Sequence, residues 1–135
     1  MVLDTNAALD WLVFDDPRIT ALATAIAARR VRWVVSTSMR DEFAGVLTRP
    51  TFKGRSPSCE HTLSRFDAFA EVRATSPPTT TRLQCSDPDD QVFLDLAIAE
   101  RAAWLITRDK ALLVLRNRAR LHGLVIGVPE HWVAP

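Results

Sequence analysis

Two patterns of hydrophobic and polar positions follow one another along the chain. Short apolar runs without regular alternation predict strands that are buried on both faces, at residues 1–3, 31–36, 103–107 and 124–128. Segments whose apolar residues recur every third or fourth position predict helices, at residues 6–14, 15–30, 37–50, 59–72, 87–102 and 108–123. The polar, proline-rich stretch 73–86 predicts a loop or a weak edge strand.

Prolines and acids mark several of the predicted helix boundaries. Asp15 or Asp16 can cap the second helix, and Pro17 suits its first turn. Pro50 ends the third helix, because proline cannot continue the helical hydrogen bonds. Pro88 suits the first turn of the helix at 87–102.

Apolar strands separated by helices are typical of a parallel sheet that is covered on both faces. The sequence therefore predicts an α/β fold, a three-layer α/β/α sandwich with a central, mainly parallel sheet. A chain of 135 residues supports one hydrophobic core, so residues 1–135 are expected to form a single domain. Ligands of such sheets bind beyond the carboxyl ends of the strands.

Composition narrows the range of functions. The chain is 47% hydrophobic and 24% charged, with a net charge of +1, so it is neither a disordered chain nor a polycation that coats nucleic acid. Cys59 and Cys85 form no metal-binding or redox motif and are expected to be free thiols in a reducing compartment. The sequence shows no signal peptide and no membrane-spanning stretch, so a cytoplasmic location is expected.

Two acids follow predicted strands directly. Asp4 comes after the first strand, and Asp109 comes just after the strand at 103–107. Both are therefore expected at the carboxyl edge of the sheet, where ligands bind. Each of them alone is also explained as a helix cap.

A third acid is placed by helix geometry. Met39, Phe43 and Val46 form an apolar stripe along the helix at 37–50. Glu42 borders this stripe and is expected to face the site, whereas Asp41 lies about 100° further round, toward solvent.

The fourth acid comes from the segment "CSDPDDQVFLDLA". Asp90 is expected on or near the buried face of the helix at 87–102, and Asp95 is expected to point away from that face. Asp87 and Asp89 lie near the predicted helix start, where they can serve the helix dipole, and Asp87 is favoured as the cap. The sequence leaves open which of Asp87, Asp89 and Asp90 faces the ligand.

Four carboxylates that converge at one edge need cations, because like charges in a confined site raise one another's pKa. Oxygen ligands without His or Cys suit hard divalent ions, so Mg²⁺ or Mn²⁺ is the expected cofactor. Such ions polarise phosphodiesters and activate water, which predicts nuclease chemistry for Asp4, Glu42, Asp90 and Asp109.

Three stretches together resemble a known family: "VLDTNAALDWL", "VVSTSMRDEFAGVLTRPTF" and "DPDDQVFLDLAIAERAAWLITRDKALL". The chain is similar to PIN domains, and most similar to the branch of toxin components of toxin–antitoxin modules. The resemblance implies a metal-dependent ribonuclease that acts on RNA, is held by an antitoxin protein and forms a homodimer. It implies catalytic or metal-binding roles for the four acids and supporting roles for Asn6, Ser36 and Thr107. Relatives often carry an acid where this chain has Gln91.

Basic residues near the predicted site offer contacts to RNA phosphates. Arg108 and Lys110 flank Asp109, and a loop carries Arg49, Lys53 and Arg55. For each of these residues, a solvated surface position is an equally good explanation.

Two other functions fit parts of the pattern. A phosphatase of the haloacid dehalogenase type also starts with an acid after its first strand, but it needs a second acid two residues later, where this chain has Asn6. A PIN scaffold that binds RNA or protein without cutting is the other alternative. The intact carboxylates favour the nuclease.

Overall fold

The structure is a computed structural model that describes residues 1–52, 54, 58–74 and 83–135. Its strands are β1 (Val2–Leu3), β2 (Trp33–Ser36), β3 (Ala70–Arg73), β4 (Trp104–Ile106) and β5 (Val125–Gly127). Its α-helices are α1 (Thr5–Leu12), α2 (Thr20–Ala27), α3 (Thr37–Leu47), α4 (Cys59–Phe69), α5 (Gln91–Ala99), α6 (Lys110–Leu113) and α7 (Arg116–Ala119). Short 3₁₀ turns are η1 (Pro17–Ile19), η2 (Arg120–His122) and η3 (Pro129–His131).

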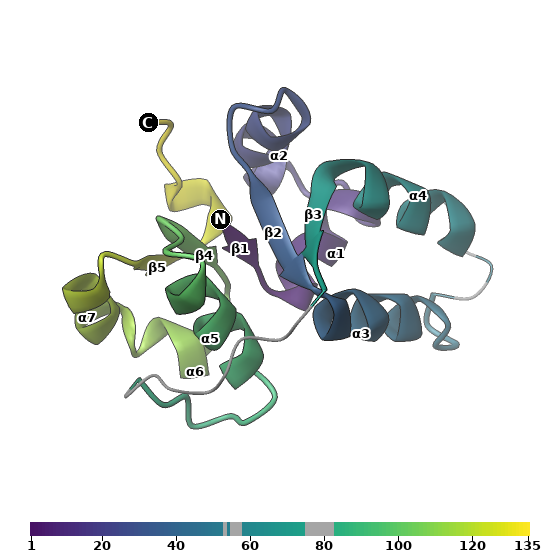
Figure 1. The fold of residues 1–135 in the computed structure, drawn as a ribbon. Coiled ribbons are helices and arrows are strands. Elements are labelled where there is room, and N and C mark those ends of the chain that lie inside the picture. The colour runs from purple at the N-terminus through teal and green to yellow at the C-terminus, as the bar shows by residue number, and fades with distance from the viewer. Residues whose placement is uncertain (53, 55–57, 75–82) are drawn as a thin grey trace.

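All strand pairings are parallel, as predicted. One sheet has the order β1-β4-β5, and a second sheet pairs β2 with β3. The sheets adjoin at β1 and β2, where the Val34 N–H donates to the Met1 carbonyl oxygen at 3.0 Å (Figure 1). The carboxyl ends of the strands consequently face one side of the molecule.

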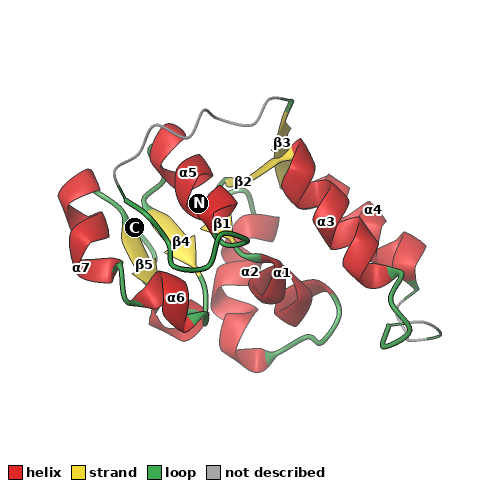
Figure 2. Cartoon of the chain, turned by 90° about the horizontal axis from the view of Figure 1, so that it is seen from below, coloured by secondary structure: helices red, strands yellow, loops and turns green. Residues whose placement is uncertain are grey.

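Helices lie on both sides of these strands, which confirms the predicted α/β fold. Helix α5 packs on β1 and β4, while α1 and α2 lie on the other side (Figure 2). The apolar strand residues fill the space between the layers, and Leu3, Trp33, Leu105 and Ile106 are almost completely buried. A core of this kind fixes the strand ends against each other, which positions whatever follows them.

One strand was missed by the sequence prediction. The helix expected at 59–72 ends at Phe69, and β3 follows it at once, paired with β2 from Trp33↔Ala70 to Ser36↔Arg73. Phe66 packs edge-on against Trp33 at 4.6 Å between ring centroids, which anchors the end of α4 over β2. Pairing with the exposed edge of β2 therefore overrides the local helical pattern.

Other helix boundaries also differ from the prediction. The helix expected at 15–30 divides into η1 and α2, although Asp16 does cap η1 by accepting from the Arg18 N–H. The helix expected at 108–123 divides into α6, α7 and η2. Leu112, Leu115 and Ala119 are buried on both sides of the break, at the i, i+3 and i+7 spacing that the sequence pattern has.

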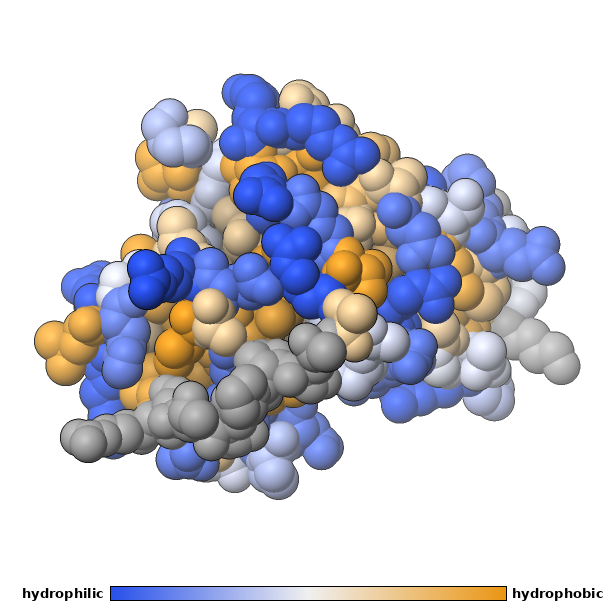
Figure 3. Space-filling view, in the orientation of Figure 1, coloured by the Kyte–Doolittle hydropathy of each residue, from blue (hydrophilic) through white to orange (hydrophobic). Residues whose placement is uncertain are grey.

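The outer surface is mixed in character. On the face seen in Figure 3, hydrophilic residues are widely spread, with hydrophobic residues in smaller patches between them. None of the helices in the described ranges is long and apolar enough to cross a membrane. Cys59 and Cys85 are free thiols.

Candidate metal centre at the carboxyl edge of the sheet

The ends of neighbouring strands β1 and β4 bring two acids to one edge. Asp4 follows β1, and its N–H extends the ladder by donating to the Ile106 carbonyl at 3.1 Å. Asp109 lies three residues beyond the end of β4 and caps α6, with its Oδ1 accepting from the Ala111 N–H at 2.8 Å. Because β1 and β4 are paired in parallel, both carboxylates lie at the same edge of the sheet, beyond the carboxyl ends of these strands.

Asp4 is the buried corner of the site. Its side chain is held by two donors: the Ala7 N–H at 2.8 Å to Oδ1 and the Thr107 hydroxyl at 2.5 Å to Oδ2. The residue is only 4% exposed, and burial raises the pKa of its carboxyl to about 6, against the lowering effect of the two hydrogen bonds.

Thr107 links the first acid to the last. Its hydroxyl donates to Asp4 and accepts from the Asp109 N–H at 2.9 Å. Thr107 is fully buried, and its own N–H donates to the Gly127 carbonyl of β5. One hydroxyl therefore fixes the relative positions of Asp4 and the Asp109 backbone.

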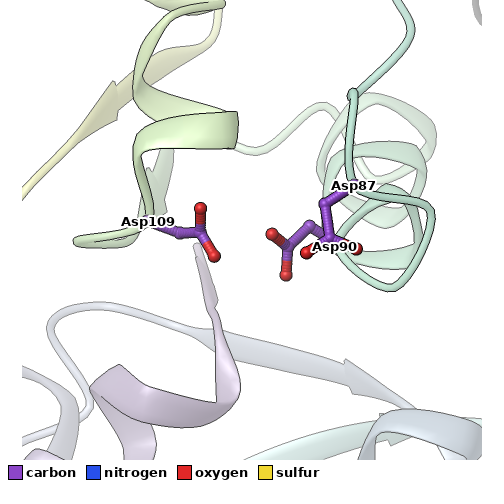
Figure 4. Close-up of side chains that lie close together, drawn as sticks. All are labelled: Asp87, Asp90 and Asp109. Carbon is purple, nitrogen blue, oxygen red and sulfur yellow. The ribbon is translucent and has the colours of Figure 1, made fainter.

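Three carboxylates converge opposite this corner. One oxygen each of Asp87, Asp90 and Asp109 lies within 4.8 Å of the others. In Figure 4, Asp109 comes from one side and the other two from the segment before α5, and the carboxylates of Asp90 and Asp109 point toward the space between them. Asp90 Oδ2 is buried and has no hydrogen-bond partner among the described residues.

The electrostatics of this cluster are unfavourable in the absence of a cation. The pKa of Asp90 is raised to about 7, first by desolvation and then by the adjacent Asp109, with smaller contributions from Asp87 and Asp4. A buried, unpartnered carboxylate oxygen among like charges fits a hard divalent cation, which prefers oxygen ligands. The residues present therefore suit the predicted cofactor class, Mg²⁺ or Mn²⁺.

The segment before α5 differs from the prediction. Helix α5 starts at Gln91, so Pro88 lies in a turn before the helix and not in its first turn. Asp87 does accept a backbone hydrogen bond, from the Asp89 N–H at 3.0 Å, as an N-terminal cap would. It also belongs to the three-acid cluster, a position that its expected role as the cap of the helix did not include.

Gln91 and Asp95 hold this segment in place. Gln91 Nε2 donates to the Leu83 carbonyl at 3.0 Å and to Asp95 Oδ1 at 2.9 Å, while its Oε1 accepts from the Cys85 N–H at 2.6 Å. Asp95 is 8% exposed, so the prediction that it points away from the buried face was wrong. Its carboxylate turns inward because the Gln91 amide provides a donor there.

A pocket of about 160 Å³ lies at the acidic edge. Glu42 and Asp41 are both exposed, but Glu42 lines the pocket and Asp41 does not, in keeping with the predicted helix geometry. Asn6 also lines the pocket, and Ser36, which is buried, caps α3 by accepting from the Met39 N–H at 3.3 Å. The other residues that line it are Asp4, Thr5, Leu9, Val46, Arg49, Asp89, Asp90, Phe93 and Asp109.

Of the basic residues predicted to contact phosphates, Arg49 lines the pocket, and the others lie elsewhere or outside the described residues. Arg108 forms ion pairs with Asp10 at 3.6 Å and with Glu130 at 2.9 Å, and within the described ranges neither it nor Lys110 lines the pocket. Lys53 and Arg55 are not among the residues that the structure describes.

Two residues that the sequence analysis named near the site were expected in a different local structure. Asp87 was assigned to capping, because the helix was expected to begin four residues earlier than it does. Arg49 was treated as part of a loop, although it follows Glu42 and Val46 at helical spacing and lines the same pocket. That spacing was the available signal for Arg49.

A comparison with known families gives one match. A family model described as PIN domain matches residues 1–111, a range that includes all the acids of the pocket. Searches among curated proteins and among solved structures found no match.

Proposed function

Because the chain belongs to the PIN domain family, we propose that it is a divalent-metal-dependent endoribonuclease that hydrolyses phosphodiester bonds in single-stranded RNA. PIN domains are typically metal-dependent nucleases. The observation that carries the proposal is the cluster of Asp87, Asp90 and Asp109, with a buried Asp90 oxygen that no described residue satisfies.

Asp87, Asp90 and Asp109 are the residues proposed to hold the ion. Asp4 and Glu42 complete the proposed ligand set, since both line the pocket, and each carboxylate oxygen of Asp4 has lone-pair capacity beyond its one hydrogen bond. A bound Mg²⁺ or Mn²⁺ supplies Lewis-acid polarisation of the phosphodiester and of the attacking water, and stabilises the charge that develops on the leaving oxygen.

The protein's own residues supply position and charge. Thr107 holds Asp4 and the Asp109 backbone in register, and the Ser36 cap fixes the start of α3, which carries Glu42. Asn6 adds a neutral polar side chain to the pocket. The acidic lining repels RNA phosphates, so productive binding of RNA is expected to require the cation.

The wider biological role is part of the same proposal. Residues 1–135 act as a single domain, in the cytoplasm, as the toxin of a toxin–antitoxin pair whose antitoxin protein binds and restrains it, and the active form is a homodimer. This part rests on the resemblance of the three sequence stretches to that branch of the family.

The test is a cleavage assay on end-labelled single-stranded RNA. The purified protein is incubated with Mg²⁺, with Mn²⁺ and with EDTA, beside the isosteric variant Asp109→Asn. Cleavage is expected with either metal, none in EDTA, and none with the variant, because it removes one charge from the cluster.

Two outcomes would contradict the proposal in different ways. Cleavage that persists in EDTA or in Asp109→Asn would exclude the metal mechanism. RNA binding without cleavage under all conditions would favour the scaffold alternative. Size-exclusion chromatography with light scattering separately tests the homodimer.

A further inference from the structure

The charged residues that line the pocket are acidic with one exception among the described residues. Among the described residues that line it, Arg49 is the only cation, beside the carboxylates of Asp4, Glu42, Asp89, Asp90 and Asp109. A site that accepts a polyanion needs positive charge beyond the ion in its centre, because each further phosphate meets the same acids.

Arg49 is placed by the end of α3. Glu42, Val46 and Arg49 are spaced by four and three residues, so they lie along one face that lines the pocket. The Arg49 N–H donates to the Val46 carbonyl at 3.1 Å, and the Arg49 carbonyl accepts from the Phe52 N–H at 2.9 Å, so the backbone is held on both sides.

The Arg49 guanidinium is not engaged by any acid that the structure describes. Five arginines form ion pairs with acids: Arg18, Arg32, Arg40, Arg73 and Arg108. Arg49 is exposed, and no ion pair joins it to an acid within the described ranges. Its five N–H donors therefore remain available to a ligand, and a phosphate matches their fork geometry.

An aromatic pair adjoins the turn that carries Arg49. The Phe52 ring lies 5.9 Å from the Phe14 ring between centroids, at an interplanar angle of 49°. Phe14 is 44% exposed, which is unusual for a large apolar side chain, and its N–H donates to the carbonyl of Leu9, which lines the pocket. The pair therefore connects the end of α1 to the Arg49 turn.

We propose that Arg49 and the Phe14–Phe52 pair form a binding rim for single-stranded RNA, in which Arg49 holds a phosphate next to the scissile one and Phe14 stacks a neighbouring base. Unstacked bases and phosphates are what aromatic faces and arginine recognise in single strands, whereas the bases of a duplex are already stacked. The inference rests on the proposed function and adds the substrate contacts that the acids cannot provide.

The test removes the charge of Arg49 and the ring of Phe14 in separate variants of the full chain. Arg49→Gln is paired with Arg30→Gln, an exposed arginine that precedes β2 and so lies toward the opposite end of the strands. Phe14→Leu removes the ring, and Phe14→Tyr keeps it. KM and kcat are measured on a fluorogenic oligoribonucleotide with Mn²⁺ over a range of salt concentrations, and melting temperatures are measured for all variants.

Arg49→Gln is expected to raise KM at least about five-fold with a smaller change in kcat, and to reduce the slope of log KM against log salt by about 0.7, the value for one phosphate contact on a single strand. Phe14→Leu is expected to raise KM by about five-fold or more, the scale of one stacked base, while Phe14→Tyr and Arg30→Gln match the wild type.

A KM for Arg49→Gln equal to that of Arg30→Gln, with an unchanged salt slope, overturns the phosphate contact. A KM for Phe14→Leu equal to that of the wild type overturns the stacking contact, as does an equal rise in Phe14→Tyr. The anisotropy of the same oligonucleotide with Mn²⁺, measured before any product accumulates, separates this inference from the nuclease proposal. If the wild type binds the oligonucleotide but never cleaves it, and both Arg49→Gln and Phe14→Leu weaken this binding, the proposed rim stands and the nuclease proposal is wrong.

Discussion

The two sides of the acidic pocket are built in different ways. On one side, Asp4 is buried and both of its oxygens accept hydrogen bonds, one of them from Thr107. On the other side, Asp90 comes from a turn that also carries Asp87; both are partly exposed, and one buried oxygen of Asp90 has no described partner. The first side is satisfied by hydrogen bonds within the fold, whereas the second side has an acceptor that the proposed cation would satisfy.

This difference leads us to expect that the proposed metal ion would stabilise the Asp90 side of the pocket more than the Asp4 side. The core fixes the ends of β1 and β4, so Asp4 and Asp109 are placed as the sheet forms. Asp90 lies close to Asp109, and the pKa of its carboxyl is raised first by burial and then by the adjacent Asp109. Functional sites commonly retain such unfavourable arrangements, at the expense of stability.

The largest expected effect comes from neutralising the unsatisfied side. Asp90→Asn is expected to lower the cleavage rate by at least about 10²- to 10³-fold, because several kcal/mol of metal-dependent stabilisation are lost. In EDTA at pH 8, the same variant is expected to melt at a higher temperature than the wild type, since a strained negative charge is removed. Single-turnover cleavage and thermal denaturation check the two effects. A variant that is both inactive and less stable would show that Asp90 is part of the scaffold.

The next effect is the pH dependence of metal affinity. Protons and the ion compete for Asp4 and Asp90, whose pKa values are raised to about 6 and about 7. Mn²⁺ affinity is therefore expected to rise on the order of 10- to 100-fold between pH 5.5 and pH 8, as both carboxyls ionise. Isothermal titration calorimetry measures it, and a flat profile would contradict ligation by these two acids.

Stability without metal should change in the opposite direction. Both carboxyls have folded pKa values above the model value of 3.8, so between pH 4 and pH 7 the folded state binds more protons than the unfolded state. The free energy of unfolding in EDTA is therefore expected to fall as the pH rises through this window, and saturating Mg²⁺ should reverse the loss. Urea denaturation at several pH values measures both trends.

Thr107→Val separates the scaffold from the metal ligands. The substitution keeps the shape of the side chain but leaves Asp4 Oδ2 and the Asp109 N–H without their buried partner. We expect a loss of about 1–3 kcal/mol in the free energy of unfolding. Activity should fall by about 10- to 100-fold, as for groups that orient metal ligands. Thr107→Ser, which keeps the hydroxyl, is the matched control, and equal losses in both variants would refute the bridging role.

The sequence predicted the satisfied side of the pocket better than the unsatisfied one. Asp4 and Asp109 follow strands whose apolar runs are unmistakable, and parallel pairing then brings the two acids to one edge. The segment from Asp87 to Gln91 was misread, because Pro88 suits a helix start as well as the turn that it occupies. Which of these conformations forms depends on hydrogen bonds from Gln91 to Leu83 and Cys85, contacts that no local pattern reveals.

Two other misreadings have the same physical origin. Strand β3 continues from a helical pattern, and only the free edge of β2 makes it extended. Asp95 was assigned to the solvent side by its position on the helix relative to the apolar face, but the Gln91 amide satisfies its carboxylate inside. In each case a contact with another segment decides the conformation, whereas periodicity reports only the preference of the segment itself.

The smallest expected effect tests Gln91, a position where the family resemblance leads us to expect an acid. If this position simply lacked a metal ligand, Gln91→Glu would add one and raise the affinity or the number of Mn²⁺ ions bound. The contacts predict otherwise: a glutamate cannot donate to the Leu83 carbonyl, and it would place a second carboxylate against Asp95. We therefore expect a loss of about 1–3 kcal/mol in the free energy of unfolding and no gain in Mn²⁺ binding.

The control is Gln91→Met, which removes the hydrogen bonds without adding charge. It should be less destabilised than Gln91→Glu at pH 8, and the free energies of unfolding of the two variants should converge at pH 4. If Gln91→Glu instead binds an additional ion, the side chain turns toward the pocket and the segment before α5 is held by something other than Gln91.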